Sequence, residues 1–263
     1  MNVLDFPERK KNHQRIVMVT CYDATSASIL QESEVDMLLV GDSAAMVMHG
    51  QHTTLPIGVE DLAMHVRAVR RGAPDKFIVA DLPFLASRKG LQAAMEAVEA
   101  LMKAGAQAVK IEGVAGQQDL LRHIVESGVP VMGHLGLTPQ SVHQLGGFRV
   151  QARDAAARER LLEEARACQQ AGCFALVLEC VPEAVAAQVT RALAIPTIGI
   201  GAGVATDGQV LVMHDLLGLG TGPSPRFVRQ YLDGRGLFLD AFNRFASDVR
   251  EGAFPDAGER YAG

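Results

Sequence analysis

The sequence contains no tryptophan, and only 5% of its 263 residues are aromatic, whereas 48% are hydrophobic. Its core must therefore be built mainly from aliphatic side chains, as is typical of parallel sheets. No apolar run reaches the length of a membrane span, and the polar first residues contain no signal-peptide core. We therefore expect a soluble, cytoplasmic protein.

Cysteine and positive charge are also scarce. The four cysteines form no CxxC pair, which favours free thiols in a reducing compartment over disulfides. The net charge of −5 argues against nucleic acid or an anionic membrane as a partner. It does not exclude small anionic substrates, because local charge can hold these.

Apolar segments with strand character recur along the chain and alternate with segments of helical periodicity. Parallel strands need crossover connections, so this alternation predicts a parallel sheet, and eight strands close into an α/β barrel of the (β/α)8 TIM type. An open, doubly wound sheet is the competing architecture. The expected strands cover residues 16–21, 36–43, 76–83, 108–113, 130–136, 174–180, 196–203 and 209–215.

The intervening helical segments complete this pattern. Only the connection 202–208 is too short for a full helix, and residues 227–251 should add one or two extra C-terminal helices. We expect the whole chain, 1–263, to form a single barrel domain. The expected helices between strands cover residues 24–32, 59–70, 91–103, 118–126, 154–170 and 182–194.

Charged side chains and a histidine stand at the C-terminal ends of several expected strands. In a barrel these ends converge on one rim, where such enzymes keep their active sites. A single acid there is usually an N-cap for the next helix, but four acids with a lysine and a histidine indicate a shared site. These residues are Asp42, Asp81, Lys110, Glu112, His134 and Glu179.

Lys110 and Glu112 lie in one expected strand, two positions apart, so their side chains point to the same face. A buried charged pair costs several kcal/mol of desolvation unless it is used there. Taken alone, the pair fits a structural salt bridge as well as it fits a functional site.

Four clustered carboxylates need a counter-charge. All-oxygen ligands without Cys or His at metal spacing point to Mg²⁺ or Mn²⁺, held by Asp42, Asp81 and Glu112 directly or through water. Glu179 is then available for proton transfer, and Lys110 favours an anionic substrate group such as a carboxylate. The pattern indicates enolisation of a metal-chelated 2-oxo acid by a carboxylate base.

Other motifs are weaker. His49 and His52 resemble a ligand pair, but no third ligand is spaced to join them, so loop structure is the better interpretation. Residues 199–203, GIGAG, lack the third glycine of a dinucleotide fingerprint and indicate a tight turn instead. Ser43 could be an N-cap or a donor to substrate.

Several stretches together resemble the ketopantoate hydroxymethyltransferase family, whose barrels are related to the phosphoenolpyruvate/pyruvate superfamily. They are MLLVGDSAAMVMHGQHTTLPI, AVRRGAPDKFIVADLPF, AGAQAVKIEG, VPVMGHLGLTPQSV, LVLECVP and AIPTIGIGAGVATDGQVLVMHD. The resemblance implies transfer of a hydroxymethyl group from 5,10-methylenetetrahydrofolate to 3-methyl-2-oxobutanoate, giving 2-dehydropantoate in pantothenate synthesis. It also implies a cytoplasmic homodecamer of two pentameric rings.

The resemblance assigns roles residue by residue. It implies a Mg²⁺ site and an oxo-acid site that share two aspartates, a glutamate as proton acceptor, and a histidine at the substrate pocket. These are Asp42, Asp81 and Glu112 for Mg²⁺; Asp42, Ser43, Asp81 and Lys110 for the oxo acid; Glu179 as acceptor; and His134 at the pocket.

Two rival functions use the same residue types. A Mg²⁺-dependent C–C lyase or phosphonomutase of the same superfamily would bind a similar 2-oxo acid, but such enzymes typically place a cysteine or another acid in a mobile loop. Cys180 directly follows Glu179, and Cys21 lies at the end of the first strand. A non-catalytic metabolite-binding barrel would not need a spare base.

Overall fold

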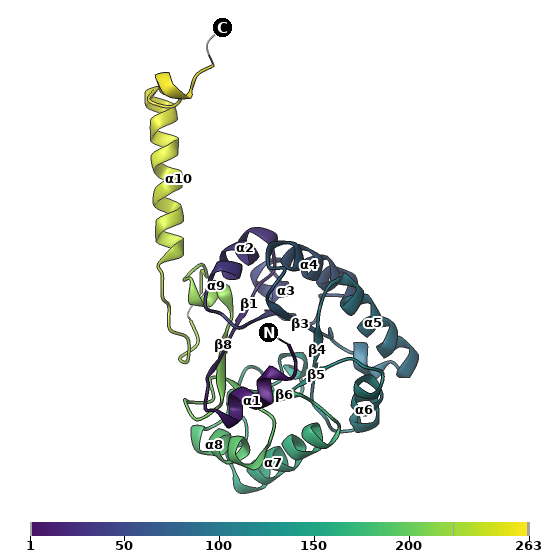
Figure 1. Cartoon of the computed structure of the whole chain (residues 1–263). Helices are drawn as coiled ribbons and strands as arrows, with labels where there is room; N and C mark the ends of the chain where they lie inside the picture. The colour runs from purple at the N-terminus through teal and green to yellow at the C-terminus, as the bar shows by residue number, and fades with distance from the viewer. Residues whose placement is uncertain (1, 223, 262–263) are drawn as a thin grey trace. The chain divides into compact units, whose positions relative to one another are not determined.

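The computed structural model describes residues 2–222 and 224–261, which pack into two compact units that meet in sequence at Val212 and Met213. The first unit is a closed barrel of parallel strands in chain order (Figure 1). The predicted (β/α)8 barrel is confirmed. The strands are β1 (Ile16–Thr20), β2 (Met37–Val40), β3 (Phe77–Asp81), β4 (Ala108–Glu112), β5 (Val131–Gly136), β6 (Ala175–Glu179), β7 (Thr197–Ile200) and β8 (Gly208–Leu211).

Closure comes from the pairing of β1 with β8, which rules out the open sheet. Every residue of β2 and β3 is buried, as expected for strands that are covered by side chains inside and by helices outside. The register sets Asp81 opposite Lys110, and Glu112 opposite His134. Neighbouring strands therefore bring polar residues to one level of the barrel.

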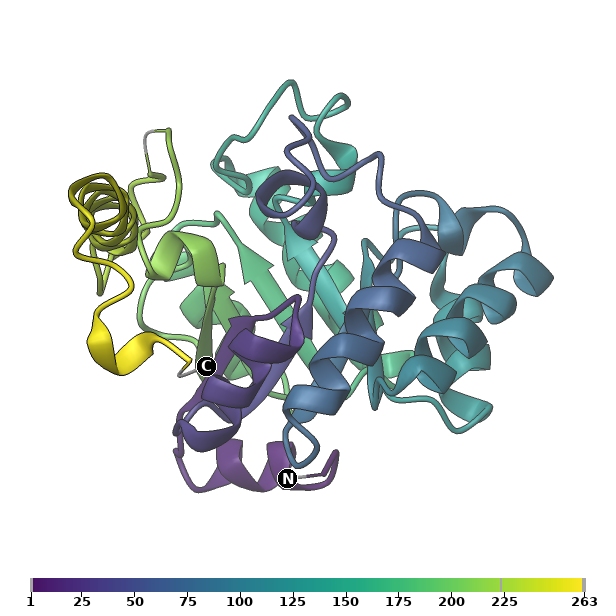
Figure 2. The same cartoon turned by 90° about the horizontal axis from the view of Figure 1, so that it is seen from above.

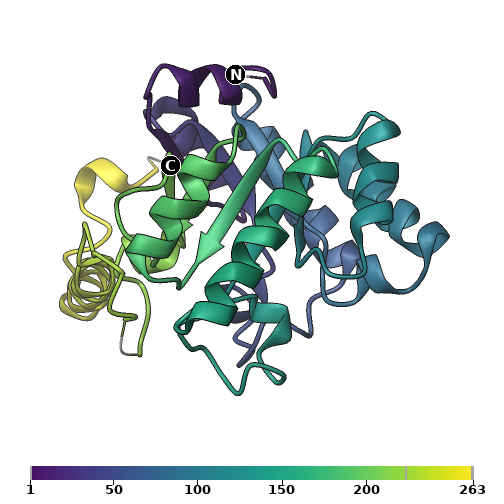
Figure 3. The same cartoon turned by 90° about the horizontal axis from the view of Figure 1, so that it is seen from below.

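The helices of the first unit surround the barrel. On one side α4 packs against α2 and α5 (Figure 2), and on another α7 packs against α8 (Figure 3). The bounds expected for α2 and α6 agree with the structure, whereas α1 and α3 were not expected. The helices are α1 (Asp5–Lys11), α2 (Ala24–Glu32), α3 (Ala44–Val47), α4 (Val59–Gly72), α5 (Leu91–Ala104), α6 (Gln118–Glu126), α7 (Ala155–Gln170) and α8 (Glu183–Ala192), with short 3₁₀ helices η1 (Ala86–Arg88) and η2 (Pro139–Ser141).

Helix α1 closes the N-terminal end of the barrel, away from the carboxyl ends of the strands (Figure 1). Its Phe6 is fully buried and joins the barrel core, with ring centroids 5.1 Å from Phe77 and 5.3 Å from Phe174. Three of the few aromatic residues thus pack together and fill the N-terminal end of the barrel.

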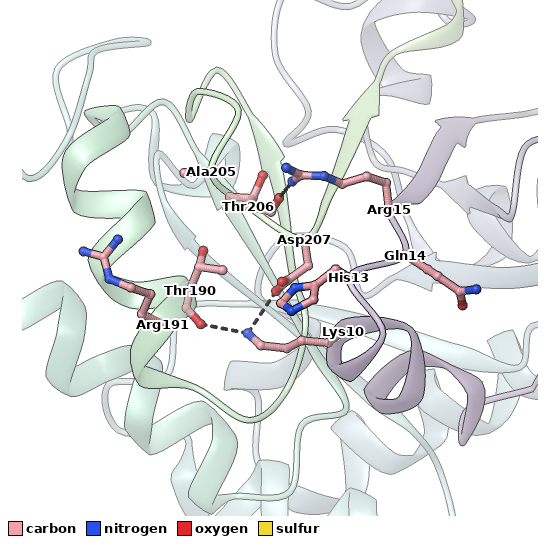
Figure 4. Close-up of a pocket in the computed structure, with 9 residues that line it drawn as sticks. All are labelled: Lys10, His13, Gln14, Arg15, Thr190, Arg191, Ala205, Thr206 and Asp207. Atoms are coloured by element: carbon pink, nitrogen blue, oxygen red, sulfur yellow. Dashed lines mark hydrogen bonds and ion pairs between the residues drawn. The ribbon is translucent and has the colours of Figure 1, made fainter.

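Lys10 anchors α1 beside a surface pocket of about 360 Å³ (Figure 4). Its ammonium donates to the carbonyls of Thr190 and Ile195 at 2.7 and 3.0 Å and to Oδ2 of Asp207 at 2.9 Å. The same carboxylate oxygen accepts from the backbone N–H of Thr197 at 2.8 Å. Three residues that line this pocket, Lys10, Thr190 and Asp207, thus hold α1 to the barrel.

The second unit begins at Met213 and contains α9 (Met213–Leu216), α10 (Gly234–Glu251) and the 3₁₀ helix η3 (Ala257–Glu259). The last expected strand is therefore too long, because helix α9 replaces its end. The extra C-terminal helix begins at residue 234 instead of 227. Asp233 caps it, because its side chain accepts from the N–H of Gly236 at 3.0 Å. The single domain expected over 1–263 stays a prediction. Among the described residues, no helix combines the length and apolar character that a membrane span requires.

Candidate functional site

The barrel gathers the predicted residues at the carboxyl ends of β2 to β6. Asp81, Glu112 and Glu179 are the last residues of their strands, whereas Asp42 follows β2 by two positions and His134 lies inside β5. The side chains of Asp81, Lys110, Glu112 and His134 are at most 5% exposed, and that of Glu179 is 15% exposed. These ionisable groups are therefore enclosed by the barrel, with Glu179 nearest to solvent.

Lys110 pairs with the neighbouring strand. Its Nζ lies 3.0 Å from Oδ1 of Asp81, whose other oxygen accepts from the backbone N–H of Asp42 at 2.9 Å. The buried pair is thus Lys110 with Asp81, and the carboxylate of Glu112 is left to other partners. Burial favours the neutral amine, but the carboxylates of Asp81, Glu112 and Asp42 outweigh it and raise the pKa of Lys110.

His134 stands between two carboxylates. Its Nδ1 lies 3.4 Å from Oε1 of Glu112 and 3.1 Å from Nζ of Lys110, and its Nε2 lies 3.2 Å from Oε2 of Glu179. Burial and the Lys110 charge favour the neutral ring, but Glu112 and Glu179 outweigh them and raise the pKa of His134 to about 9. Nε2 faces Glu179, whereas Nδ1 lies between Lys110, from which it can accept when the ring is neutral, and Glu112, which it faces as a donor when the ring is protonated.

The acids differ in their electrostatic surroundings. Burial raises the pKa of Asp42 well above its usual range, and the charges of Asp81 and Glu112 add to this effect. Burial also raises the pKa of Asp81, although Lys110 opposes it. Burial acts in the same direction on Glu112, but its contact with His134 and the charges of His134 and Lys110 lower the pKa of Glu112 overall. The cluster has an excess of negative charge that an added cation would relieve.

Gln140 belongs to this site, although no sequence pattern predicted it. It lies in η2, in the connection after β5, and its side-chain Nε2 donates to Oδ2 of Asp42 and to the carbonyl of Leu82, each at 2.9 Å. Its backbone N–H donates to Oε2 of Glu112 at 3.0 Å. The signal available in the sequence was its position after a strand that carries a site residue.

Ser43 occupies the N-cap position of α3 without capping it, so the N-cap interpretation is wrong. Its Oγ instead shares a hydrogen bond of 2.8 Å with the hydroxyl of Tyr22, a buried residue just after β1. The role of Ser43 as a donor to substrate stays a prediction.

The weaker motifs have structural partners. His49 Nε2 lies 3.0 Å from Nε2 of His65, whose Nδ1 donates to the carbonyl of Tyr22 at 2.6 Å. His49, which is itself exposed, therefore contacts the buried His65, as the loop interpretation allows. In the GIGAG segment, Gly201 and Gly203 have positive φ values of 62° and 76°, which agrees with a tight turn.

The donor set fits a hard divalent cation. Oδ1 of Asp81, apart from its ion pair with Lys110, and Oε1 of Glu112 are buried oxygens without a hydrogen-bond donor. Across residues 2–222 and 224–261, no group of three or more His, Cys, Asp or Glu side chains is arranged to hold a metal ion. Mg²⁺ needs no such cage, because it takes one or two carboxylates and completes its shell with water and substrate.

Solved structures show what the fold is similar to. A 2,3-dimethylmalate lyase, a member of the PEP mutase/isocitrate lyase superfamily, matches with a TM-score of 0.61 and 15% identity over 99% of this chain and 91% of its own. A phosphonopyruvate hydrolase in complex with oxalate and Mg²⁺ matches with a TM-score of 0.65 and 10% identity over 98% and 93%. At these identities the likeness concerns the barrel alone.

Relatives in sequence are much closer. The 3-methyl-2-oxobutanoate hydroxymethyltransferase of Bdellovibrio bacteriovorus is 56% identical over 260 residues, 99% of each chain. The enzyme of that name from Coxiella burnetii is 52% identical over 256 residues, 97% of this chain and 96% of its own. The family model described as ketopantoate hydroxymethyltransferase matches residues 1–257. The chain belongs to the ketopantoate hydroxymethyltransferase family.

Proposed function

We propose that this enzyme transfers a hydroxymethyl group from 5,10-methylenetetrahydrofolate to 3-methyl-2-oxobutanoate, giving 2-dehydropantoate and tetrahydrofolate. The observation that supports it best is the division of the site into two parts. Lys110, with the oxygens of Asp81 and Glu112 that accept no hydrogen bond, forms one part. Glu179, whose side chain is more exposed than those of Asp81 and Glu112, forms the other. Binding and proton transfer thus have separate carboxylates.

Asp42, Asp81 and Glu112 would hold Mg²⁺, one or two of them directly and the rest through water. When bound, the ion withdraws charge from the keto oxygen of the oxo acid and so stabilises the enolate. Burial raises the pKa of Asp42 in the metal-free protein, and a bound cation would favour its ionised form. The uneven pKa shifts of the three acids suit a site that is completed by an added positive charge.

Lys110, with Ser43, would bind the carboxylate of the oxo acid, and Asp42 and Asp81 would act on the oxo acid through the cation that they hold. Its buried ammonium is fixed at 3.0 Å from Asp81, so its remaining donors keep one orientation. The Tyr22 hydroxyl holds the Ser43 Oγ at 2.8 Å and thereby limits its rotation. These groups orient the substrate so that its C3–H bond faces the other part of the site.

Glu179 would remove the C3 proton of the oxo acid. The ring of His134, whose Nε2 lies 3.2 Å from Oε2 of Glu179, orients this carboxylate. One of the two C–N bonds of the folate methylene carbon breaks as the ring opens to the iminium form, and C3 then forms a C–C bond with that carbon. Water supplies the hydroxyl group as the second C–N bond breaks and tetrahydrofolate leaves. Glu179 is left holding the proton that the substrate lost.

Proton exchange tests this function. With Mg²⁺ and 3-methyl-2-oxobutanoate in D₂O, we expect loss of the C3 proton signal by NMR, and 2-dehydropantoate once the folate is added. Glu179→Gln should bind the oxo acid but lose exchange, whereas Glu183→Gln, four positions later and exposed, should behave as wild type. Exchange at the wild-type rate in Glu179→Gln would remove this residue from its role. Exchange without any folate-dependent product would instead favour the C–C lyase alternative.

We further propose a cytoplasmic homo-oligomer, a decamer of two pentamers. Helix α10 supports self-association, because Phe238, Phe242, Phe245 and Val249 repeat at helical spacing and are 49–69% exposed. Light scattering after size exclusion should give the mass of ten chains. Phe242→Asp should reduce that mass, and an unchanged mass would separate α10 from assembly.

A further inference from the structure

Gln140 joins the ends of three strands from outside them. Its side chain reaches Asp42 after β2 and the carbonyl of Leu82 after β3, and its backbone N–H reaches Glu112 at the end of β4. The connections after β2 and β5 extend from the same end of the barrel in Figure 2. One residue of the β5 connection thus contacts two of the three carboxylates assigned above to Mg²⁺.

The geometry leaves the Gln140 amide a single orientation. Both of its N–H bonds point at acceptors, the Asp42 carboxylate and the Leu82 carbonyl, each at 2.9 Å. The reversed amide would set its own oxygen against these two acceptors and would satisfy neither. Gln140 is therefore a fixed donor, and it determines the direction of the Asp42 carboxylate.

The backbone contact has a complementary effect on Glu112. Because the Gln140 N–H binds Oε2, the carboxylate is held with Oε1 free of a hydrogen bond and contacted only by His134 Nδ1 at 3.4 Å, among the contacts that the described residues make. Oxygens that are buried, open and held in place are those that a hard cation can bind without reorganisation. The two contacts of Gln140 act on two carboxylates but share one short 3₁₀ turn.

We propose that Gln140 is a positioning residue that orients Asp42 and Glu112 for a divalent cation. This inference rests on the metal site of the proposed function. It has a second consequence, because a residue that orients the ligands from the β5 connection also couples that connection to the cation. Binding of the cation should therefore stabilise the connection, and seating of the connection should tighten binding by the same factor.

The test uses Gln140→Met, which keeps the side-chain length and removes only the donor. Mn²⁺ binding to the otherwise metal-free protein is followed by electron paramagnetic resonance. We expect an affinity about 10- to 100-fold below wild type, the usual cost of losing a partner that orients a ligand. Gln144→Met is the matched control, since it lies four residues later in the same connection with an exposed side chain. Its Mn²⁺ affinity should equal that of wild type.

Backbone hydrogen exchange in the β5 connection is measured with and without Mn²⁺. The protection that Mn²⁺ adds would not depend on Gln140 if this residue only stabilised the fold. Added Mn²⁺ should slow exchange there in wild type and Gln144→Met, and much less in Gln140→Met. If Gln140→Met fails to fold by circular dichroism, Gln140→Leu replaces it in both measurements.

The outcomes separate this inference from the proposed function. Wild-type Mn²⁺ affinity in Gln140→Met refutes the role of Gln140 and leaves the function intact. Wild type that binds no Mn²⁺ refutes both the metal site and the inference. Wild type that binds Mn²⁺ but neither exchanges the C3 proton nor forms product refutes the function, while weakened Mn²⁺ binding in Gln140→Met still supports the inference.

Discussion

Replacement of Lys110 by methionine separates binding of the oxo acid from binding of the cation. Methionine keeps the apolar stem and removes the ammonium that lies 3.0 Å from Asp81. A substrate carboxylate would lose its buried positive partner, whereas a cation would lose a competing positive charge. We therefore expect the two affinities to move in opposite directions, with the oxo acid bound more weakly and the cation at least as tightly.

The expected magnitude follows from the burial of the pair. A hydrogen bond to a charged group contributes about 1.5–3 kcal/mol, and the side chains of Lys110 and Asp81 are only 5% and 3% exposed, so solvent cannot replace the lost contact. This range corresponds to a 3-methyl-2-oxobutanoate affinity roughly 10- to 150-fold below wild type. The unpaired Asp81 carboxylate should also lower the stability of the metal-free protein, and Mg²⁺ should offset part of this loss.

Isothermal titration calorimetry with 3-methyl-2-oxobutanoate at saturating Mg²⁺ measures the first affinity, and titration with Mg²⁺ alone measures the second. Lys103→Met is the control, because that side chain is 76% exposed and pairs with Glu99 on the surface of α5. It should change neither value. An oxo-acid affinity within about threefold of wild type in Lys110→Met would refute the assigned role, as would a large loss of Mg²⁺ affinity.

Three further predictions concern stability and reactivity. Lys10→Met should lower the free energy of unfolding by about 3 kcal/mol and the melting temperature in calorimetry by roughly 6–10 °C. Lys11→Met is the control, because the Lys11 side chain is 70% exposed and its loss should lower the free energy of unfolding by under about 1 kcal/mol. Equal shifts in the two variants would contradict the anchoring of α1. Phe6→Ala should cost about 3–5 kcal/mol in urea unfolding, and a loss under about 1 kcal/mol would show that this packing is dispensable. Burial raises the pKa of the Cys180 thiol to about 11. The rate of its alkylation, measured by peptide mass spectrometry, should therefore rise about tenfold per pH unit from pH 8 to 10. A rate that levels off below pH 9 would disprove this.

The strands were predictable because their requirement is simple. A strand covered on both faces must be apolar along its length, and a break in that pattern at its end is visible without a structure. Asp81, Glu112 and Glu179 could be placed for this reason, since each ends an apolar run. Their meeting at one rim then follows from barrel closure.

Features that depend on distant contacts were not predictable. Helix α1 has seven residues and buries only Phe6, and an isolated helix of that length is marginal in water. It forms because Lys10 reaches residues 180 or more positions away. Gln140 is similar, because a glutamine in a loop resembles any exposed polar residue until the fold places Asp42 and Leu82 beside it.

The anchoring of α1 also bears on the order of events during synthesis. Lys10 and Asp207 are 197 positions apart, and ribosomes add roughly 5–20 residues per second, so the helix waits about 10–40 s for its partner to be made. During that interval Phe6 has no completed barrel to enter. Helix α1 can therefore close the N-terminal end of the barrel only after nearly all of the strands have been synthesised. Until then the nascent chain exposes Phe6 near its N-terminus, where chaperones can bind it.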